Sequence, residues 1–249
     1  KDLNEMEIKV LGSGSSGGVP LIGSYWGSCD PNNLKNDRTR VSIVIKVNNT
    51  NILIDTSPDL RKQAIDNNIN SIDAVCWTHA HADHVHGIDD LRQFLWGRKQ
   101  NLPVYTNKST MNTIQNRFDY VFDKNNTYFN PPLKPIIINP GKFEILGNEV
   151  YAFNQNHGKE TTLGYRINNF AYSTDVNSFP DDSKKYLYNL DVWIVDCVRY
   201  EPHYSHSHLD LTLEWIKEYK PKKAYLTHLG AWLDYEELIK KCPKEVFPA

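Results

Sequence analysis

The sequence has few cysteines, and they lie far apart. There are four in 249 residues, at positions without paired spacing: Cys29, Cys76, Cys197 and Cys242. This scatter argues against a disulfide framework, which small secreted domains build from regularly spaced cysteines. A reducing, cytoplasmic location is therefore expected.

Long apolar runs and an excess of positive charge are missing too. The sequence has no run of about 18 apolar residues, so no membrane-spanning helix is expected, and no signal-peptide pattern is found. The formal net charge is −2 at pH 7. This total argues against a protein held on nucleic acid by bulk charge, although it is compatible with a local basic groove.

The chain has enough apolar residues for a sizeable core, since 40% are hydrophobic and 12% aromatic. We expect a single domain over residues 1–249, because no linker divides the chain. Helices are predicted at Pro58–Asn67, Ile88–Trp96, Asp210–Tyr219 and Tyr235–Lys241. Short β-strands are predicted at Ile8–Leu11, Ser42–Val47, Ile52–Asp55, Ala74–Thr78, Phe143–Leu146, Val150–Asn154, Gly164–Ile167, Ala171–Ser173, Val192–Asp196 and Lys223–Thr227.

The order of these elements indicates the architecture. Strands come first in pairs and then alternate with helices, and this order is roughly repeated in the second half. The pattern favours two β-rich halves packed face to face, with helices outside, over a doubly wound parallel sheet. Residues 97–135 give the weakest signal, and Asn125–Pro140, rich in Asn and Pro, predicts a long loop.

Four side chains of the types that bind metals gather in one short segment: His79, His81, Asp83 and His84. They directly follow a predicted buried strand, where α/β proteins place their sites. Imidazole nitrogens and carboxylate oxygens suit zinc, manganese or iron. One tight turn cannot direct all four groups at a single ion, so we expect one ion on His79 and His81 and another on Asp83 and His84. A histidine-rich surface loop is the alternative, which this density of ligand types disfavours.

Three more candidate ligands stand after predicted strands elsewhere in the chain: His157, Asp175 and His228. Each one alone is more often structural than functional. Because folding can bring several strand ends to one edge, the joint pattern indicates that all three complete the metal site.

The segment His79–His84 resembles the His-x-His-x-Asp-His signature of the metallo-β-lactamase superfamily, and the three later residues fall where that family has its other ligands. The resemblance implies an α/β fold, a four-layer αββα sandwich in which two mixed β-sheets lie face to face with helices outside. It implies two divalent ions per chain, Zn²⁺ or Mn²⁺, with Asp175 bridging them. The implied ligand sets are His79, His81 and His157 for one ion and Asp83, His84 and His228 for the other.

Further segments resemble the phosphodiesterase branch of that superfamily. These are the Gly- and Ser-rich segment Leu11–Pro20 and Ile54–Thr56. The branch includes the RNase Z tRNA-processing enzymes and the phosphoribosyl cyclic phosphodiesterase of phosphonate breakdown. Trp26–Pro31 and Thr39–Arg40 are closer to the second of these.

The chain departs from the phosphonate-pathway enzyme at a second metal site. That enzyme holds a structural zinc with a cluster of cysteines after its first loop and a histidine beyond the last catalytic ligand. Here Cys29 stands alone, and Ala231 occupies the histidine position. No structural zinc is therefore expected in this chain.

The implied function is the hydrolysis of a small cyclic or nucleotide-like phosphate diester by attack of a metal-bound hydroxide. Asp83 would orient the hydroxide as well as bind metal. For the departing oxygen we expect a histidine acid at His208, because the branch has a non-ligand catalytic histidine just before a helix N-cap, here Asp210. His206 is the reserve, and a solvated loop histidine is the alternative for both.

Candidate substrate-binding residues are Ser15, Ser16, Arg40 and His206. The two serines lie in a Gly-rich loop whose backbone N–H groups could approach a phosphate. The loop lacks a following helix and a P-loop lysine, so a structural turn is an equal alternative. Arg40 would bind a phosphate through its guanidinium group, and an ordinary surface arginine is again the alternative.

Other functions stay open. A tRNA 3′-processing endonuclease resembling RNase Z would be expected to carry a long flexible arm, and no basic Gly/Pro-rich insertion of that kind is found. A thioester or lactone hydrolase would use the same metal centre, whereas the full ligand set disfavours a non-enzymatic binding protein. The expected partner is a small phosphodiester or nucleotide-like substrate, with nucleic acid not favoured, no membrane, and a homodimer left open.

Overall fold

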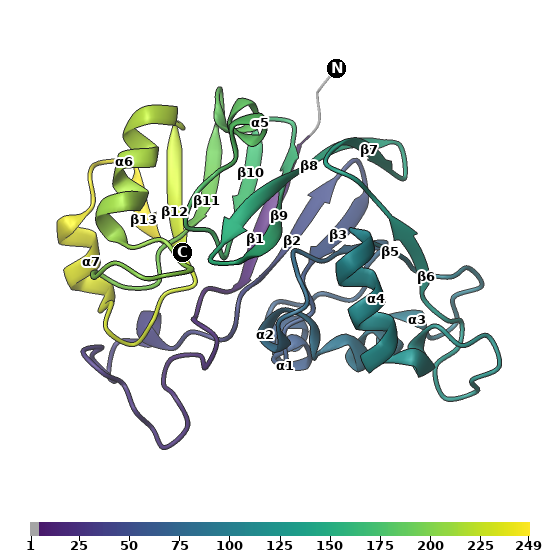
Figure 1. Cartoon of the computed structure of the whole chain (residues 1–249). Coiled ribbons are helices and arrows are strands. Elements are labelled where there is room, and N and C mark those ends of the chain that lie inside the picture. Colours follow the sequence, from purple (N-terminus) through teal and green to yellow (C-terminus); the bar gives the residue numbers. More distant parts are fainter. Residues whose placement is uncertain (1–4) are drawn as a thin grey trace. The chain divides into compact units, whose positions relative to one another are not determined.

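The computed structural model describes residues 5–249, which form two mixed β-sheets flanked by helices (Figure 1). The chain divides into two compact units. The first comprises residues 5–11, 42–139 and 145–148, and the second comprises residues 12–41, 140–144 and 149–249. The single domain expected over residues 1–249 stays a prediction, and its first four residues lie outside the described part.

The first sheet has six strands in sequence order. They are β1 (Glu7–Gly12), β2 (Ser42–Val47), β3 (Thr50–Ile54), β4 (Ala74–Cys76), β5 (Pro103–Thr106) and β6 (Lys134–Ile137). Strands β2 and β3 form an antiparallel hairpin, and β3 to β6 run parallel. The hairpin turns at Asn48 and Asn49, with φ angles of 46° and 60°. Asparagine tolerates this left-handed conformation, which two-residue hairpin loops require.

The helices of the first unit are α1 (Leu60–Asp66), α2 (Ala82–Val85), α3 (Arg92–Leu95) and α4 (Lys108–Arg117), with 3₁₀ turns η2 (Ile88–Leu91) and η3 (Asp119–Val121). Their apolar residues join the sheet in one core that includes Leu53, Val75, Trp77, Met111 and Ile114. Helix α4 begins after Asn107, whose side chain accepts a hydrogen bond from the Thr110 N–H and so caps the helix.

The second sheet has seven strands in the order β13-β12-β11-β10-β9-β8-β7. They are β7 (Gly141–Ile145), β8 (Asn148–His157), β9 (Glu160–Ile167), β10 (Phe170–Ser173), β11 (Val192–Asp196), β12 (Lys223–Thr227) and β13 (Val246–Pro248). Strands β10 to β13 are parallel, and β9 is antiparallel to both β8 and β10. Strands β8, β10, β11 and β12 therefore all end at the same edge of the sheet.

The second unit carries α5 (Asp181–Lys184), α6 (Leu209–Tyr219) and α7 (Tyr235–Lys241), with 3₁₀ turns η1 (Leu34–Asn36) and η4 (Lys185–Leu187). Helix α6 lies beside β11 and β12 in Figure 1. Its Trp215 packs edge-on against Phe179, with ring centroids 4.8 Å apart, and both neighbour the fully buried Trp193 of β11. This aromatic group fixes the helix on the sheet.

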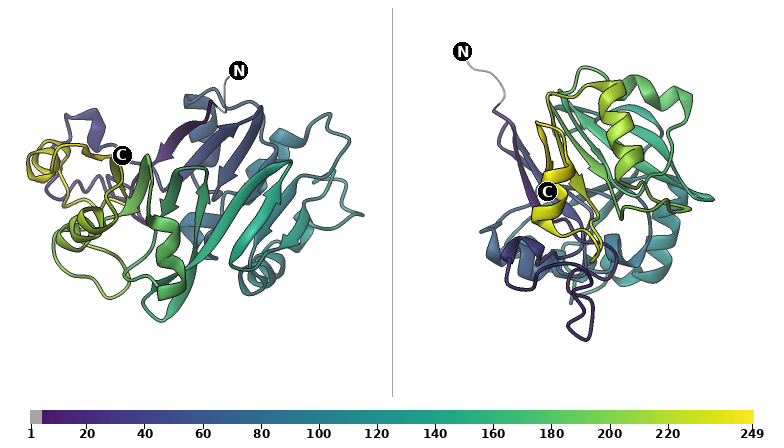
Figure 2. Two further views of the ribbon diagram at one scale, coloured as in Figure 1. Left: turned by 90° about the horizontal axis from the view of Figure 1, so that it is seen from above. Right: turned by 90° about the vertical axis from the view of Figure 1, so that its left-hand side faces the viewer.

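The loop that follows β1 packs against the end of the chain. In Figures 1 and 2 this segment, drawn in dark purple, lies beside the yellow C-terminal residues. The Ser28 N–H donates to the Ala231 carbonyl at 2.9 Å, and the Asn36 amide donates to the Asp234 carboxylate at 2.8 Å. Residues about 200 positions apart in the sequence thus share one rigid substructure.

The predicted strands all appear, with ends shifted by a few residues. The sequence missed α2, β5, α4, β6, α5 and β13, which are short or carry few apolar residues. The predicted loop Asn125–Pro140 was wrong in part, because β6 lies within it as an edge strand, a position that tolerates its Pro135. The predicted helix Ile88–Trp96 is a 3₁₀ turn followed by the single turn of α3. Among residues 5–249, no helix has both the length and the apolar character needed to cross a bilayer.

Among the glycines of the first unit, Gly87 has the least room for a side chain. We expect Gly87→Ala to lower the free energy of unfolding by about 3 kcal/mol, because its Cβ would lie 1.8 Å from the Ser57 carbonyl oxygen. Gly97→Ala is the matched control: nothing lies within 4 Å of the added Cβ, so only its positive φ adds a cost of about 1 kcal/mol. Urea unfolding curves measure both, and equal losses would contradict the steric argument.

Candidate metal centre and active site

The predicted ligand segment begins at the carboxyl end of β4. His79 and His81 lie on the loop after this strand, whereas Asp83 and His84 lie in the short helix α2 rather than on the loop. Arg117 of α4 donates a hydrogen bond to the Ala80 carbonyl in the middle of this segment. A helix that sequence analysis missed thus supports the ligand loop.

Asp55, which follows β3, fixes the orientation of His84. Its Oδ2 accepts hydrogen bonds from His84 Nδ1 at 2.6 Å and from the Thr78 hydroxyl at 2.8 Å. Its Oδ1 accepts from the Thr78 backbone N–H at 2.8 Å. Because His84 Nδ1 carries the proton, its Nε2 presents a lone pair, 3.3 Å from Asp83 Oδ2. Two acceptors at that separation suit a cation between them.

The pKa of the Asp55 carboxyl is raised by complete burial, and the neighbouring His84 and Thr78 act against that rise. A carboxylate that orients a metal-binding imidazole is a common support for such ligands. Asp55 is therefore placed to orient His84, and the metal-binding groups found among residues 5–249 do not include it.

His79 is oriented by the same network. The Thr78 hydroxyl donates to Asp55, so it accepts the proton of His79 Nδ1 at 2.9 Å. The lone pair of His79 Nε2 then faces His81 Nδ1 at 3.0 Å. We call the set His79, His81, Asp83 and His84 the first cluster.

A second cluster lies at the edge of the other sheet where four parallel strands end. His157 and Asp196 are the last residues of β8 and β11, His228 directly follows β12, and Asp175 follows β10 by two residues. His206, on the loop between β11 and α6, joins them. Asp175, Asp196, His206 and His228 offer ligand atoms within 4.8 Å of one another.

The Asp175 carboxylate faces a different imidazole with each of its oxygens. Its Oδ2 lies 3.5 Å from His157 Nε2, and its Oδ1 lies 3.6 Å from His228 Nε2. His157 Nδ1 is 2.6 Å from the Ser205 carbonyl and donates to it, which leaves a lone pair on Nε2. Burial lowers the pKa of His157 and so favours this neutral form. The arrangement fits a carboxylate that bridges two cations.

His206, named above as the reserve for the catalytic histidine, is a member of the second cluster. Its Nδ1 donates to Asp196 Oδ2 at 3.0 Å, and its ring stacks on His228 with centroids 4.4 Å apart. Its Nε2 lies 3.8 Å from Asp175 Oδ2. His208 instead occupies the N-cap of α6, where Asp210 was expected, and the metal-binding groups found among residues 5–249 do not include it.

Sequence analysis did not single out Asp196, although a signal was present. This residue ends the apolar strand β11, just as Asp55 and Asp175 follow strands. Besides His206, its Oδ2 accepts the backbone N–H groups of Ser207 at 3.0 Å and Val176 at 3.3 Å. A fully buried carboxylate with three donors is well placed to hold a histidine in one orientation.

Three residues of these networks have strained backbone. Asp55, Asp175 and His228 have φ angles of 65°, 51° and 60°, and non-glycine residues adopt such angles mainly where the surrounding structure enforces them. For His228 the enforcement comes from the loop after β1. The Leu229 N–H donates to the Ser13 carbonyl at 2.7 Å, and the Ser15 N–H donates to the Leu229 carbonyl at 3.1 Å.

Three of the predicted substrate-binding residues, Ser15, Ser16 and Arg40, lie in the segment after β1. The Ser15 N–H is engaged by Leu229, which gives this part of the Gly-rich loop a structural role. Ser16 is exposed and Arg40 half-buried. Gly14 forms isolated parallel β-bridges with Arg40 and with Leu229. A Cβ atom added to Gly14 would lie 2.5 Å from the Arg38 carbonyl oxygen. Substrate contact by Ser15, Ser16 and Arg40 stays a prediction.

Cys29, which stands alone in the segment after β1, belongs to a hydrogen-bonded network. Arg38, which is buried, donates to Cys29 Sγ at 3.7 Å and to Asn36 Oδ1 at 3.3 Å, and Asn36 donates to Asp234. Burial raises the pKa of the Cys29 thiol, so the protonated form is favoured. All four cysteines of the chain are free, in agreement with the expected lack of disulfides.

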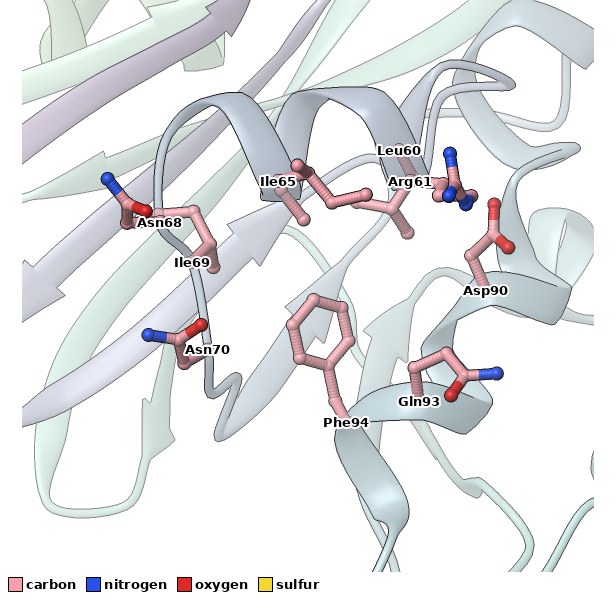
Figure 3. A pocket seen from close by; sticks show the side chains of 10 residues that line it. Leu60, Arg61, Ile65, Asn68, Ile69, Asn70, Asp90, Gln93 and Phe94 are labelled. Atoms are coloured by element: carbon pink, nitrogen blue, oxygen red, sulfur yellow. The ribbon is translucent and has the colours of Figure 1, made fainter.

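A cavity of about 580 Å³ lies between α1 and α3 in the first unit. Figure 3 shows Arg61 and Asp90 close together at one end, Asn70 toward the other, and Ile65 and Phe94 between them. No histidine or cysteine lines it. The cavity therefore lacks the imidazoles of the two clusters, and Asp90 is the single carboxylate in its lining.

The model of the family described as "Beta-lactamase superfamily domain" matches residues 50–229. The chain belongs to the β-lactamase superfamily. The His/Asp clusters of this superfamily member could hold metal. The predicted α/β fold with two mixed sheets is confirmed.

Several proteins are similar to this superfamily member. A solved structure described as a new diphosphatase from the PhnP family is 32% identical, with a TM-score of 0.90. The match covers 99% of this chain and 94% of the chain of that structure. Human tRNase Z, short form, is 16% identical with a TM-score of 0.67, over 99% of this chain and 96% of its own, a likeness of fold alone. An octanoyltransferase of Porphyromonas gingivalis is 35% identical over 228 residues, 90% of this chain but 46% of that protein. The chain thus spans less than half the length of this curated relative.

We expect Asp55→Asn to weaken metal binding by the first cluster roughly 10- to 100-fold, the usual effect of losing the partner of a metal-binding histidine. The amide can turn its N–H₂ group toward His84 and so disturb the orientation of that ring. Competition against a chromophoric chelator measures the affinity, with Asp66→Asn, an exposed carboxylate paired with Lys62, as the matched control. Unchanged affinity in a folded Asp55→Asn protein would contradict the positioning role.

Proposed function

We propose that this protein is a binuclear metal-dependent phosphodiesterase that hydrolyses a small cyclic or nucleotide-like phosphate diester. The observation that carries the proposal is Asp175, whose two carboxylate oxygens face two different imidazole nitrogens at 3.5 and 3.6 Å. A carboxylate so placed can join two ions, and two-metal sites are one way in which enzymes hydrolyse phosphate esters. The similarity to a PhnP-family diphosphatase supports a small phosphate compound as substrate.

The proposed ligand sets combine the two clusters. One ion would be held by His79, His81 and His157, and the other by Asp83, His84 and His228, with Asp175 shared. Imidazole and carboxylate donors suit Zn²⁺ or Mn²⁺. When bound, two such ions supply an activated water at neutral pH and polarise the phosphoryl oxygen.

The residues of the chain would have separate tasks in the reaction. Asp83 would orient the attacking water through its second oxygen. His206 would deliver a proton from Nε2 to the departing oxygen, while its Nδ1–H stays on Asp196. The buried Asp196 keeps the ring in place and stabilises its positive charge before the proton leaves.

His206 is favoured over His208 for this proton transfer. Both stand on the loop before α6, but His206 has its Nε2 beside Asp175, whereas His208 caps the helix. Sequence analysis favoured His208 by its distance from the expected N-cap. That alignment relied on a helix start at Asp210, and the helix begins at Leu209.

Substrate class is tested by comparing hydrolysis rates on four compounds with the Mn²⁺- or Zn²⁺-loaded protein. These are bis(p-nitrophenyl) phosphate, a 2′,3′-cyclic nucleotide, a precursor tRNA and a thioester. We expect turnover of the first two. Preference for precursor tRNA would instead support a tRNA 3′-processing endonuclease. Preference for the thioester would support a thioester or lactone hydrolase.

Metal content tests the bridging role of Asp175. We expect two ions per chain in the wild-type protein, and Asp175→Ala to retain its fold but lose at least one ion and nearly all activity. Elemental analysis and circular dichroism measure these quantities, with the exposed Asp181→Ala as the matched control. Near-normal turnover in Asp175→Ala, or a third tightly held zinc near Cys29, would contradict the assignment.

The role of His206 is tested by the leaving group. We expect His206→Ala to lower kcat by roughly 10²- to 10⁴-fold on substrates with a poor leaving group. The loss should be smaller on p-nitrophenyl esters, whose leaving group departs without a proton, and the metal content should not change. His208→Ala is the matched control. Loss of a metal ion in His206→Ala would make this residue a ligand, and the stated pattern in His208→Ala alone would return the role to that residue.

A further inference from the structure

A surface cavity of about 700 Å³ lies in the first unit, at the end of α3 and beside residues 127–131. Its lining contains none of the residues of the two clusters. All the charged side chains that line it are cations: Arg92, Arg98 and Lys99. In a chain with a net charge of −2, a hollow lined by three cations and no acid is a local attractor for anions.

Two large aromatic side chains line the same cavity. Trp96 is 90% exposed and Tyr128 is 53% exposed. Both therefore present ring surface to solvent next to the cations. Exposed rings beside positive charge match the composition of sites that stack nucleobases and hold phosphates.

The Tyr128 ring is held in place before any ligand arrives. The Arg92 guanidinium carbon lies 4.1 Å from the ring centroid, on one of its faces. The Tyr128 hydroxyl donates to Asp89 Oδ2 at 3.2 Å. A ring fixed at its edge and supported on one face is a rigid platform, so stacking on it costs little conformational entropy.

The cations differ in how they are held. Arg98 Nε donates to the Gln100 carbonyl at 2.9 Å, and its Nη1 donates to the Ile72 carbonyl at 3.1 Å. A guanidinium has five N–H donors, so Arg98 is fixed and still has donors for an anion. Lys99 is exposed and adds a flexible point charge. The fixed Arg98 guanidinium and the flexible Lys99 ammonium together suit a phosphate group.

We propose that this cavity is a nucleotide-binding site separate from the hydrolytic centre. The base would stack on Trp96 or Tyr128, and the phosphate would pair with Arg98 and Lys99. The volume lies in the range of roughly 300–1,000 Å³ that small-molecule sites occupy. A free nucleotide and one residue of a single-stranded nucleic acid present the same chemistry, and the experiment separates the two sources.

The test measures equilibrium binding of AMP and of a fluorescein-labelled oligothymidylate to the metal-loaded protein. We expect Trp96→Ala to weaken binding roughly 5- to 100-fold, as for the loss of one stacked base. Lys99→Ala should weaken binding and reduce its salt dependence. Hydrolysis of bis(p-nitrophenyl) phosphate should be unchanged in both variants, which separates this site from the reaction.

Matched controls exist elsewhere on the chain. Trp232→Ala removes another exposed tryptophan, and Lys124→Ala removes an exposed lysine outside the cavity. Neither should change binding. AMP affinity equal to that of the oligonucleotide indicates a free nucleotide, and much tighter oligonucleotide binding indicates a single strand. Wild-type affinity in both cavity variants, or equal losses in the controls, would overturn the proposal.

Discussion

A hydrogen bond from an imidazole to a fully buried carboxylate organises each ligand cluster of this protein. In the first cluster Asp55 accepts from His84 Nδ1 at 2.6 Å. Burying such a carboxylate is unfavourable unless donors surround it. Thr78 supplies two of them, and through its hydroxyl the same carboxylate also orients His79. One buried acid thus fixes the tautomer of two imidazole rings.

In the second cluster the two carboxylates, Asp196 and Asp175, have different surroundings. Asp196 accepts hydrogen bonds from His206 and from two backbone N–H groups, so its lone pairs are used within the protein. Asp175 instead faces the Nε2 atoms of His157 and His228. The proton of His157 is on Nδ1, so two acceptors face each other across 3.5 Å. Asp175 also accepts a hydrogen bond from the Thr174 hydroxyl at Oδ1, so it differs from Asp196 in that its two oxygens face the nitrogens of two different imidazoles.

Backbone hydrogen bonds from the loop after β1 hold the candidate ligand His228 in its strained conformation. The turn with His228 pairs through Leu229 with both Ser13 and Ser15. Gly14 lets the two segments approach closely, since a Cβ would lie 2.5 Å from a carbonyl oxygen. The Gly- and Ser-rich loop therefore acts on the centre through the backbone, whatever its side chains add to substrate binding.

The sequence by itself determined the ligand types, their spacing around His79 and the strands that precede them. Strand β4, which precedes His79, is a short apolar run, so its position is a local property of the chain. The sequence missed α4, whose buried residues Met111 and Ile114 are separated by polar ones, and edge strand β6.

Only the tertiary structure decided which histidine before α6 enters the second cluster. His206 and His208 are two residues apart on one loop, and no periodicity distinguishes them there. The choice depends on where α6 begins and on the buried Asp196, ten residues away, which accepts the proton of His206. Side-chain direction on a loop is set by partners from other elements, and the local sequence does not contain those partners.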